Sequence, residues 1–223
     1  MIISVVNEKG GSGKTTIAVN LAFKFAEQGL DLMLIDADPQ RSVETMLNNR
    51  VNSGLELPFA SMSKIGDTLA KESVNLTSKY SCVVVDTGGL DSKEMRLALT
   101  VSDIVLIPTI ITSSYDQAVL NKMLALINEV SILNPKLKAL IINNRASPNP
   151  MLQGKIGKYV DFLKELDFPE NIKIANTTLY EREIYKSVVF DGKSVTELEN
   201  DNKAKDEINA LYDEILEIYK GKE

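Results

Sequence analysis

An eight-residue segment, Lys-Gly-Gly-Ser-Gly-Lys-Thr-Thr at residues 9–16, constrains the fold of this chain more than any other feature. An apolar run at residues 2–6 precedes it, and a helical pattern with Ile17, Leu21 and Phe25 on one face follows it. A strand, a glycine-rich turn and a helix in this order form a phosphate-binding loop. The glycines let several backbone N–H groups point at one anion, and the helix N-terminus adds its positive dipole. The segment therefore predicts an α/β fold that binds phosphate groups at the start of its first helix.

The residue types in this loop predict a role for each side chain. Lys14 is placed to bridge terminal phosphates, and the Thr15 hydroxyl to ligate Mg²⁺. The residues expected to contact the nucleotide here are Gly10, Gly11, Ser12, Gly13, Lys14, Thr15 and Thr16. One position departs from the pattern Gly-x-x-x-x-Gly-Lys-[Ser/Thr], because Glu8 replaces the first glycine and Lys9 follows it. An isolated lysine at such a place would be interpreted as a solvated loop residue.

Composition bounds the possible functions. The chain has 223 residues in which strand and helix patterns alternate without a linker, so we expect one domain over residues 1–223. It contains no histidine, which excludes histidine-based catalysis and His/Cys metal sites, and its only cysteine, Cys82, lies in an apolar run and is expected to be a buried thiol. The net charge of −6 argues against nucleic-acid binding through overall charge, though not against a local basic patch. No signal peptide or long apolar run is present, which predicts a cytoplasmic protein.

Short apolar runs rich in Val and Ile recur along the chain and are typical of parallel strands buried on both faces. They lie at residues 2–6, 32–35, 82–85, 104–107, 138–142 and 172–175. Helices are expected from Ser114, with a capping box formed with Gln117, to about Leu133, over 151–166 and over 203–219. Residues 48–70 are expected to form a loop and a short helix. The fold class is therefore a doubly wound, mostly parallel α/β sheet with helices on both faces and ligands at the carboxyl ends of its strands.

Two predicted strands end in aspartates. Val83-Val84-Val85 leads into Asp86, and Leu34-Ile35 leads into Asp36-Ala37-Asp38. These strand ends should lie beside the phosphate loop, where a carboxylate can hold Mg²⁺ through its water shell. An aspartate at a strand end can also simply begin a turn. The phosphate loop favours the metal-binding interpretation of Asp86.

The loop Lys-Gly-Gly-x-Gly-Lys-[Ser/Thr] and the segment Asp36-x-Asp38-Pro-Gln together resemble the deviant Walker A ATPases of the ParA/MinD family, most closely short plasmid-partition ParA proteins of the ParF type. The resemblance covers nearly the whole chain. It implies a P-loop NTPase fold, ATP and Mg²⁺ as cofactors, and ATP hydrolysis. It also implies that Lys9 reaches across a dimer to the partner's nucleotide and that Asp38 orients the attacking water. The catalytic residues would be Lys9, Lys14 and Asp38, and the metal-side residues Thr15, Asp36 and Asp86.

Two further segments resemble parts of this family. Asn144 and Arg145, after the strand at 138–142, match a strand-end Asn-Arg pair in which the asparagine reads adenine; the alternative is a loop asparagine in a turn. Residues 175–181 would cover the other side of the base. The chain has Asp86-Thr87-Gly88-Gly89 where the family often has Asp-x-Pro-Pro.

The segment from residue 178 to residue 195 resembles the part of ParA proteins that contacts DNA without sequence preference. This implies phosphate contacts by Arg182, Lys186 and Lys193, with Lys155, Lys158 and Lys164 as further contributors. An ordinary solvated charged face explains any one of them equally well.

The resemblance implies an ATP-dependent homodimer, or a higher polymer, that binds non-specific DNA of the nucleoid and is released when a small centromere-binding partner stimulates hydrolysis. Because the sequence begins at its first strand, we expect no N-terminal DNA-binding extension. The alternative is a MinD-like ATPase that positions membrane or protein cargo. Membrane binding would need a basic amphipathic tail, whereas the last helix is rich in acidic residues, so no membrane partner is expected. These are Asp206, Glu207, Asp213, Glu214 and Glu217.

Overall fold

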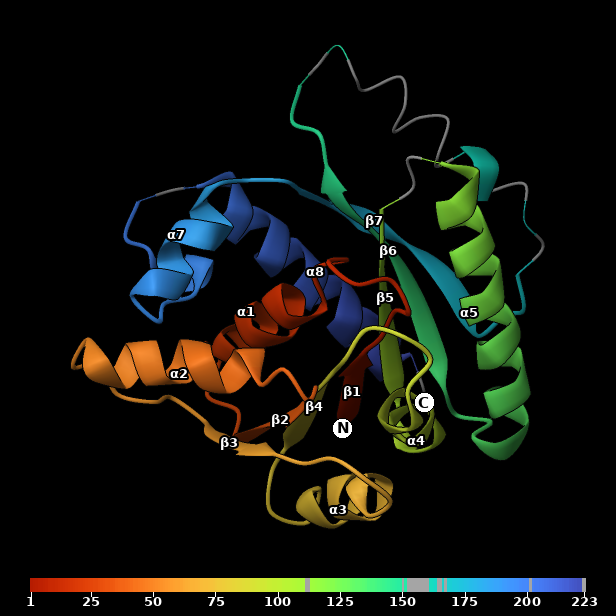
Figure 1. The fold of residues 1–223 in the computed structure, drawn as a ribbon, viewed down its shortest axis with the longest axis horizontal. Coiled ribbons are helices and arrows are strands. Elements are labelled where there is room, and N and C mark those ends of the chain that lie inside the picture. The colour runs from red at the N-terminus through yellow and green to blue at the C-terminus, as the bar shows by residue number, and fades with distance from the viewer. Residues whose placement is uncertain are drawn as a thin grey trace.

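A seven-stranded parallel sheet forms the centre of the molecule in the computed structural model, which describes residues 1–110, 113–149, 151, 161–163, 166, 168–200 and 202–221 (Figure 1). The strand order is β3-β2-β4-β1-β5-β6-β7. The strands are β1 Ile2–Val5, β2 Leu32–Ala37, β3 Ala60–Ser63, β4 Cys82–Thr87, β5 Ile104–Thr109, β6 Lys138–Ala146 and β7 Ile172–Tyr180.

Helices cover both faces of this sheet, as the doubly wound prediction requires. They are α1 Lys14–Glu27, α2 Ser42–Asn52, α3 Leu69–Leu76, α4 Lys93–Val101, α5 Ser114–Leu133, α7 Ile184–Phe190 and α8 Lys203–Lys220, with a 3-10 turn η2 at Val195–Glu197. Helices α1, α2 and α8 pack with Leu34, Val84 and Leu106 on one face. Helices α3, α4 and α5 pack on the other face. Among the described residues, no helix combines the length and apolarity needed to cross a bilayer.

The order of the strands brings the polar loops to one edge. Strand β1 lies between β4 and β5. The chain leaves β1 toward β2 on one side, whereas the connection after β4 passes β1 and reaches β5 on the other side, and such a change of direction opens a crevice at the carboxyl ends of the strands. In register, Asp86 lies beside Val5 on one side and beside Asp36 on the other. The phosphate loop and both strand-end aspartates therefore meet, as their positions in the sequence predicted.

Several elements differ from the prediction. Strand β3 lies within residues 48–70, where a loop and a short helix were expected, because Ala-Ser-Met-Ser has neither the β-branched residues nor the apolar run of a buried strand. The capping box of α5 is formed by Ser113 and Asp116 instead of Ser114 and Gln117, since two serines in succession offer overlapping boxes. The helix expected over 151–166 lies mostly outside the described residues.

Candidate nucleotide site

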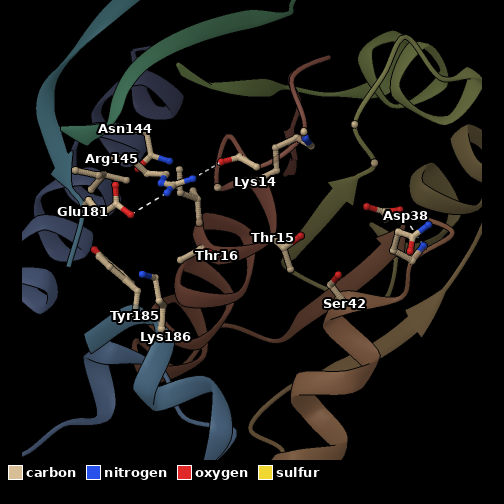
Figure 2. A pocket seen from close by; sticks show the side chains of 18 of the residues that line it. Lys14, Thr15, Thr16, Asp38, Ser42, Asn144, Arg145, Glu181, Tyr185 and Lys186 are labelled. Carbon is tan, nitrogen blue, oxygen red and sulfur yellow. Dashed lines mark hydrogen bonds and ion pairs between the residues drawn. The ribbon is translucent and has the colours of Figure 1, made fainter. Parts of the chain in front are cut away.

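A cavity of about 930 Å³ opens at the carboxyl edge of the sheet (Figure 2). One side is built from the phosphate loop, the segment after β2 and the loop after β4. The other side is built from the ends of β6 and β7 and from residues of α7 and α8. Its walls therefore come from segments far apart in the sequence, and the predicted phosphate-binding residues lie between them.

The phosphate loop has the backbone shape that its glycines allow. Gly11 and Gly13 have φ of 71° and 89°, and a Cβ on Gly13 would come within 2.3 Å of Asn144 Nδ2. Asn144 Nδ2 donates to the Ser12 carbonyl at 2.6 Å, and Arg145 Nη1 donates to the Gly11 carbonyl at 2.8 Å. The predicted Asn-Arg pair thus holds the loop itself, and both residues line the cavity, while the adenine contact of Asn144 stays a prediction.

Lys14 forms no ion pair with another residue in the described part of the chain. The residue is only 6% exposed, and its Nζ donates to the Lys9 carbonyl at 3.2 Å. Burial lowers its pKa, and the nearby carboxylates of Asp86 and Asp38 oppose this effect. Phosphate oxygens would supply the anion that this buried ammonium requires.

Asp86 is the residue best suited to a metal ion. It is completely buried, and neither carboxylate oxygen has a hydrogen-bond partner of good geometry among the described residues. Burial raises the pKa of Asp86 to about 7, although the Thr15 hydroxyl and the Lys14 ammonium act against this rise. An orphaned carboxylate facing a threonine hydroxyl fits Mg²⁺. The described residues contain no cluster of three or more His, Cys, Asp or Glu side chains, so waters and phosphates would complete the coordination shell.

Asp36 contacts backbone N–H groups instead of pointing at open space. Its oxygens accept from the N–H groups of Asp38 at 3.1 Å, Val43 at 3.2 Å and Glu44 at 3.4 Å. Burial raises its pKa, and these three bonds lower it. In this arrangement Asp36 orients the Asp38 segment and holds the start of α2. Its predicted place on the metal side remains a prediction.

Asp38 lies on the cavity wall, against the loop that follows β4. A Cβ on Gly88 would come within 3.3 Å of the Asp38 carboxylate, and one on Gly89 within 3.3 Å of Gly10 Cα. Side chains at these two positions would therefore press on both the phosphate loop and the predicted water-positioning carboxylate. This close approach explains why the chain has Gly-Gly in this loop.

Lys9 forms an ion pair within its own chain. Its ammonium contacts the Asp116 carboxylate, which is almost fully buried and also accepts from the Ser113 N–H at 3.1 Å. Asp116 belongs to the capping box of α5. The predicted contact of Lys9 with a second subunit would require this ion pair to open.

Comparison with known proteins shows the family to which this chain belongs. Residues 3–203 match the family model "CobQ/CobB/MinD/ParA nucleotide binding domain". The chain belongs to this family.

Relatives of this ParA/MinD-family protein have several named roles. It is 27% identical over 219 residues to maintenance of carboxysome distribution protein A of Halothiobacillus neapolitanus, covering 96% of this chain and 95% of that one. A putative plasmid partition protein of Borrelia burgdorferi bound to AMPPNP superposes with a TM-score of 0.71 at 22% identity, over 100% of this chain and 99% of that one. MinD of Pyrococcus horikoshii with Mg-ADP gives 0.69 at 16% identity, over 96% and 95%. The structural matches confirm the P-loop NTPase fold.

The residues predicted to contact DNA have different surroundings in this family member, and their contact with DNA stays a prediction. Arg182 is 21% exposed, its Nε donates to Glu207 at 2.9 Å, and it lines the nucleotide cavity. Lys186 lines the same cavity and donates to Glu183 at 2.8 Å. Lys193 is half-buried, and no ion pair to it is present in the described part of the chain. Lys155, Lys158 and Lys164 lie outside the described residues.

Sequence reasoning missed two buried polar residues that support the site. Asn20 Nδ2 donates to the Thr16 carbonyl at 2.7 Å, while its Oδ1 accepts from Ser194 Oγ at 2.8 Å and from Val195 N–H at 3.0 Å. Asn20 thus ties the phosphate-loop helix to the segment after α7. The signal was available, since Asn20 interrupts an apolar run of the helix, where a buried amide needs a hydrogen-bond partner.

Arg50 ties α2 to the same segment. Its guanidinium donates to Glu197 at 2.8 and 2.9 Å and to the Gly192 carbonyl at 3.1 Å, and it lies 4.8 Å from the centre of the Phe23 ring. The segment after α7 is therefore attached to both α1 and α2, the helices that follow the phosphate loop and the Asp38 segment.

Proposed function

We propose that this ParA/MinD-family protein is a Mg²⁺-dependent ATPase that hydrolyses ATP to ADP and phosphate. The main support is the orphaned, buried Asp86 carboxylate beside Thr15, at the mouth of a phosphate loop whose Lys14 lacks a full counter-charge. Both features are costly in the protein alone and become favourable when a metal–nucleotide complex binds. Lys14 stabilises charge on the phosphates, and Lys9 does the same at the nucleotide of a second subunit once its ion pair with Asp116 opens. Asp38 orients a water for in-line attack. Mg²⁺, when bound through Thr15 and Asp86, supplies further charge neutralisation.

The proposed biological role is DNA partition. An ATP-bound homodimer binds DNA without sequence preference, and hydrolysis stimulated by a small centromere-binding partner releases it. The likeness to a Borrelia burgdorferi partition protein supports this role. The second candidate is positioning of a protein cargo, because a relative that matches along nearly its full length is named for carboxysome distribution.

Hydrolysis by three variants tests the enzyme assignment. Lys14→Ala should abolish turnover and weaken nucleotide binding, because it removes a charge from a water-poor site. Asp38→Ala should bind Mg-ATP normally and lose at least about a hundredfold in turnover. Asp31→Ala is the matched control, since Asp31 lies at the opposite end of the same strand and is exposed. Normal turnover in Lys14→Ala would refute the phosphate-loop assignment.

DNA retention separates the two biological roles. We expect the parent protein to bind duplex DNA with ATP and not with ADP or without nucleotide. An ATP-bound dimer with no DNA affinity at low salt would refute partition and favour protein-cargo positioning.

A further inference from the structure

Glu181 is a carboxylate on the cavity wall that neither the metal site nor the phosphate loop uses. It directly follows β7, and its backbone N–H donates to the Ala146 carbonyl at 2.9 Å. Ala146 also pairs with Tyr180 in the register of β6 and β7. The backbone that carries Glu181 is therefore held by the sheet, and its side chain, 42% exposed, faces the cavity.

Arg145 sets the distance between this carboxylate and the phosphate loop. Its Nη1 donates to the Gly11 carbonyl and its Nη2 to Glu181 Oε1, both at 2.8 Å. One guanidinium thus spans the gap from the loop to the carboxylate. Figure 2 shows Glu181 on the wall opposite Thr16, at the start of α1. A nucleotide whose phosphates lie on the loop would place its sugar between the loop and this wall of the same cavity.

We propose that Glu181 binds the hydroxyl groups of the nucleotide's ribose and makes the site prefer ribonucleotides to deoxyribonucleotides. This inference rests on the proposed function, since it requires the phosphates to lie on the loop. Ionised carboxylates only accept hydrogen bonds, and a ribose edge offers two adjacent donors. Oε1 is bound to Arg145, whereas Oε2 has no hydrogen bond to another described residue. The same pairing of an acidic side chain with ribose is used in dinucleotide-binding folds.

The neighbourhood keeps Glu181 charged and oriented. The hydrogen bond from Arg145 lowers the pKa of Glu181, so the acceptor form persists across the physiological range. Because Arg145 also holds the loop, the carboxylate and the phosphate site are positioned by one side chain.

Glu183 provides a matched control in the same turn. Its side chain is 85% exposed, it pairs with Lys186, and it is absent from the cavity wall. Replacing either glutamate by glutamine changes the local charge equally, but only Glu181 faces the sugar.

The test is calorimetric titration of the full chain with Mg²⁺ and ADP, 2′-deoxy-ADP or 3′-deoxy-ADP. We expect the parent protein to bind ADP about tenfold more tightly than at least one deoxy analogue, which corresponds to one hydrogen bond to a charged group. The two analogues show which hydroxyl makes the contact. Glu181→Gln should bring the three affinities close together, and Glu183→Gln should keep the preference of the parent.

The ratio of affinities makes the test robust to distortion. A general disturbance of the cavity weakens all three ligands alike and leaves their ratio unchanged, whereas removal of a ribose hydrogen bond weakens only the ligand that carries the hydroxyl. Equal affinities in the parent, or an unchanged preference in Glu181→Gln, would overturn the inference while leaving nucleotide binding intact. Failure of the parent to bind ADP would overturn the proposed function as well.

Discussion

Asp86 shows how a single residue can lower stability for the sake of a site. A buried carboxylate with no hydrogen bond of good geometry to the described residues favours its protonated form in the folded protein, and burial therefore raises the pKa of Asp86 to about 7. In the unfolded chain the same group titrates near its ordinary value of 3.8. Between these two values the unfolded state releases the proton first, so rising pH favours unfolding.

We therefore predict that Asp86→Asn stabilises the protein increasingly as the pH rises. Without nucleotide and Mg²⁺, the difference in melting temperature between the variant and the parent should grow from pH 4 to pH 7 and then level off. The difference isolates Asp86, because other titrating groups are common to both proteins. A constant difference across this range would contradict the assigned environment of the carboxylate. The same variant should lose Mg²⁺-dependent hydrolysis.

The ion pair between Lys9 and Asp116 leads to a second prediction. If Lys9 must leave Asp116 to reach a second subunit, Asp116→Asn should increase the dimer fraction with AMPPNP, because asparagine keeps the helix cap but not the charge. Lys9→Ala should decrease it. Sedimentation of both variants beside the parent measures these fractions. Equal fractions in all three proteins would remove Lys9 from the dimer contact.

At the scale of residues, the sequence predicted where the site residues lie better than it predicted which side chains they contact. The spacing of Lys14, Asp38 and Asp86 was enough to place them together, since the carboxyl ends of neighbouring parallel strands share an edge. It could not show that Lys9 meets Asp116 or that Arg145 meets Glu181. The members of each pair lie far apart in the sequence, and no helical or strand periodicity links their positions. Only the folded structure therefore shows that they meet.

Among the elements, α2 and the segment after α7 make a tight contact. A Cβ on Gly192 would lie 2.2 Å from the Cα of Arg50, with φ at 65°. Arg50 is itself buried and bound to Glu197 and to the Gly192 carbonyl. No side chain larger than hydrogen can be inserted between these two backbones without separating them.

Gly192→Ala should consequently destabilise the protein by about 3 kcal/mol, the sum of backbone strain and overpacking. Gly54→Ala is the control, since Gly54 has φ of 74° but no atom near its Cβ position. It should cost only about 1 kcal/mol, the cost of the left-handed conformation. Urea unfolding of both variants gives the comparison. Equal losses would show that the contact with Arg50 can relax.

The apolar strands and the amphipathic α1 and α8 could be predicted because burial imposes a pattern on them. Strand β3 could not, since it is an edge strand with alternating exposure and no β-branched residue. The acidic residues of α8 were correctly placed on a helix, but two have structural partners. Glu214 accepts from the N–H groups of Asn176 and Thr177, and Glu207 from that of Tyr180, so both satisfy the edge of β7.

For the whole molecule, the distribution of positive charge over the surface limits where DNA could bind. A chain with a net charge of −6 must concentrate cations on one face, and a dimer doubles that face. In this structure Arg182 and Lys186 are each paired with a glutamate, which reduces their pull on a phosphate. We therefore expect Lys193, which has no ion pair to another described residue, to contribute most among the three predicted contacts.

We predict that ATP-dependent DNA binding weakens steeply with salt and is independent of sequence, because phosphate contacts release counterions and carry no sequence information. Lys193→Ala should reduce the slope of log affinity against log salt by about one for each phosphate that the lysine neutralises. The control is Lys79→Ala, since Lys79 is exposed and lies just before the amino end of β4. This variant should leave the slope unchanged. An unchanged slope in Lys193→Ala would place the DNA elsewhere on the dimer.

The two walls of the nucleotide cavity also have a consequence for biosynthesis. The loop at residues 9–16 emerges from the ribosome early, whereas Glu181 and Ile208 on the facing wall are added much later. At about 5–20 residues per second, a delay of roughly 10–40 s separates the two walls. A growing chain that already displays its phosphate loop thus cannot enclose a nucleotide. The complete cavity, and the stabilisation that a bound nucleotide gives it, therefore requires a chain synthesised at least as far as Ile208.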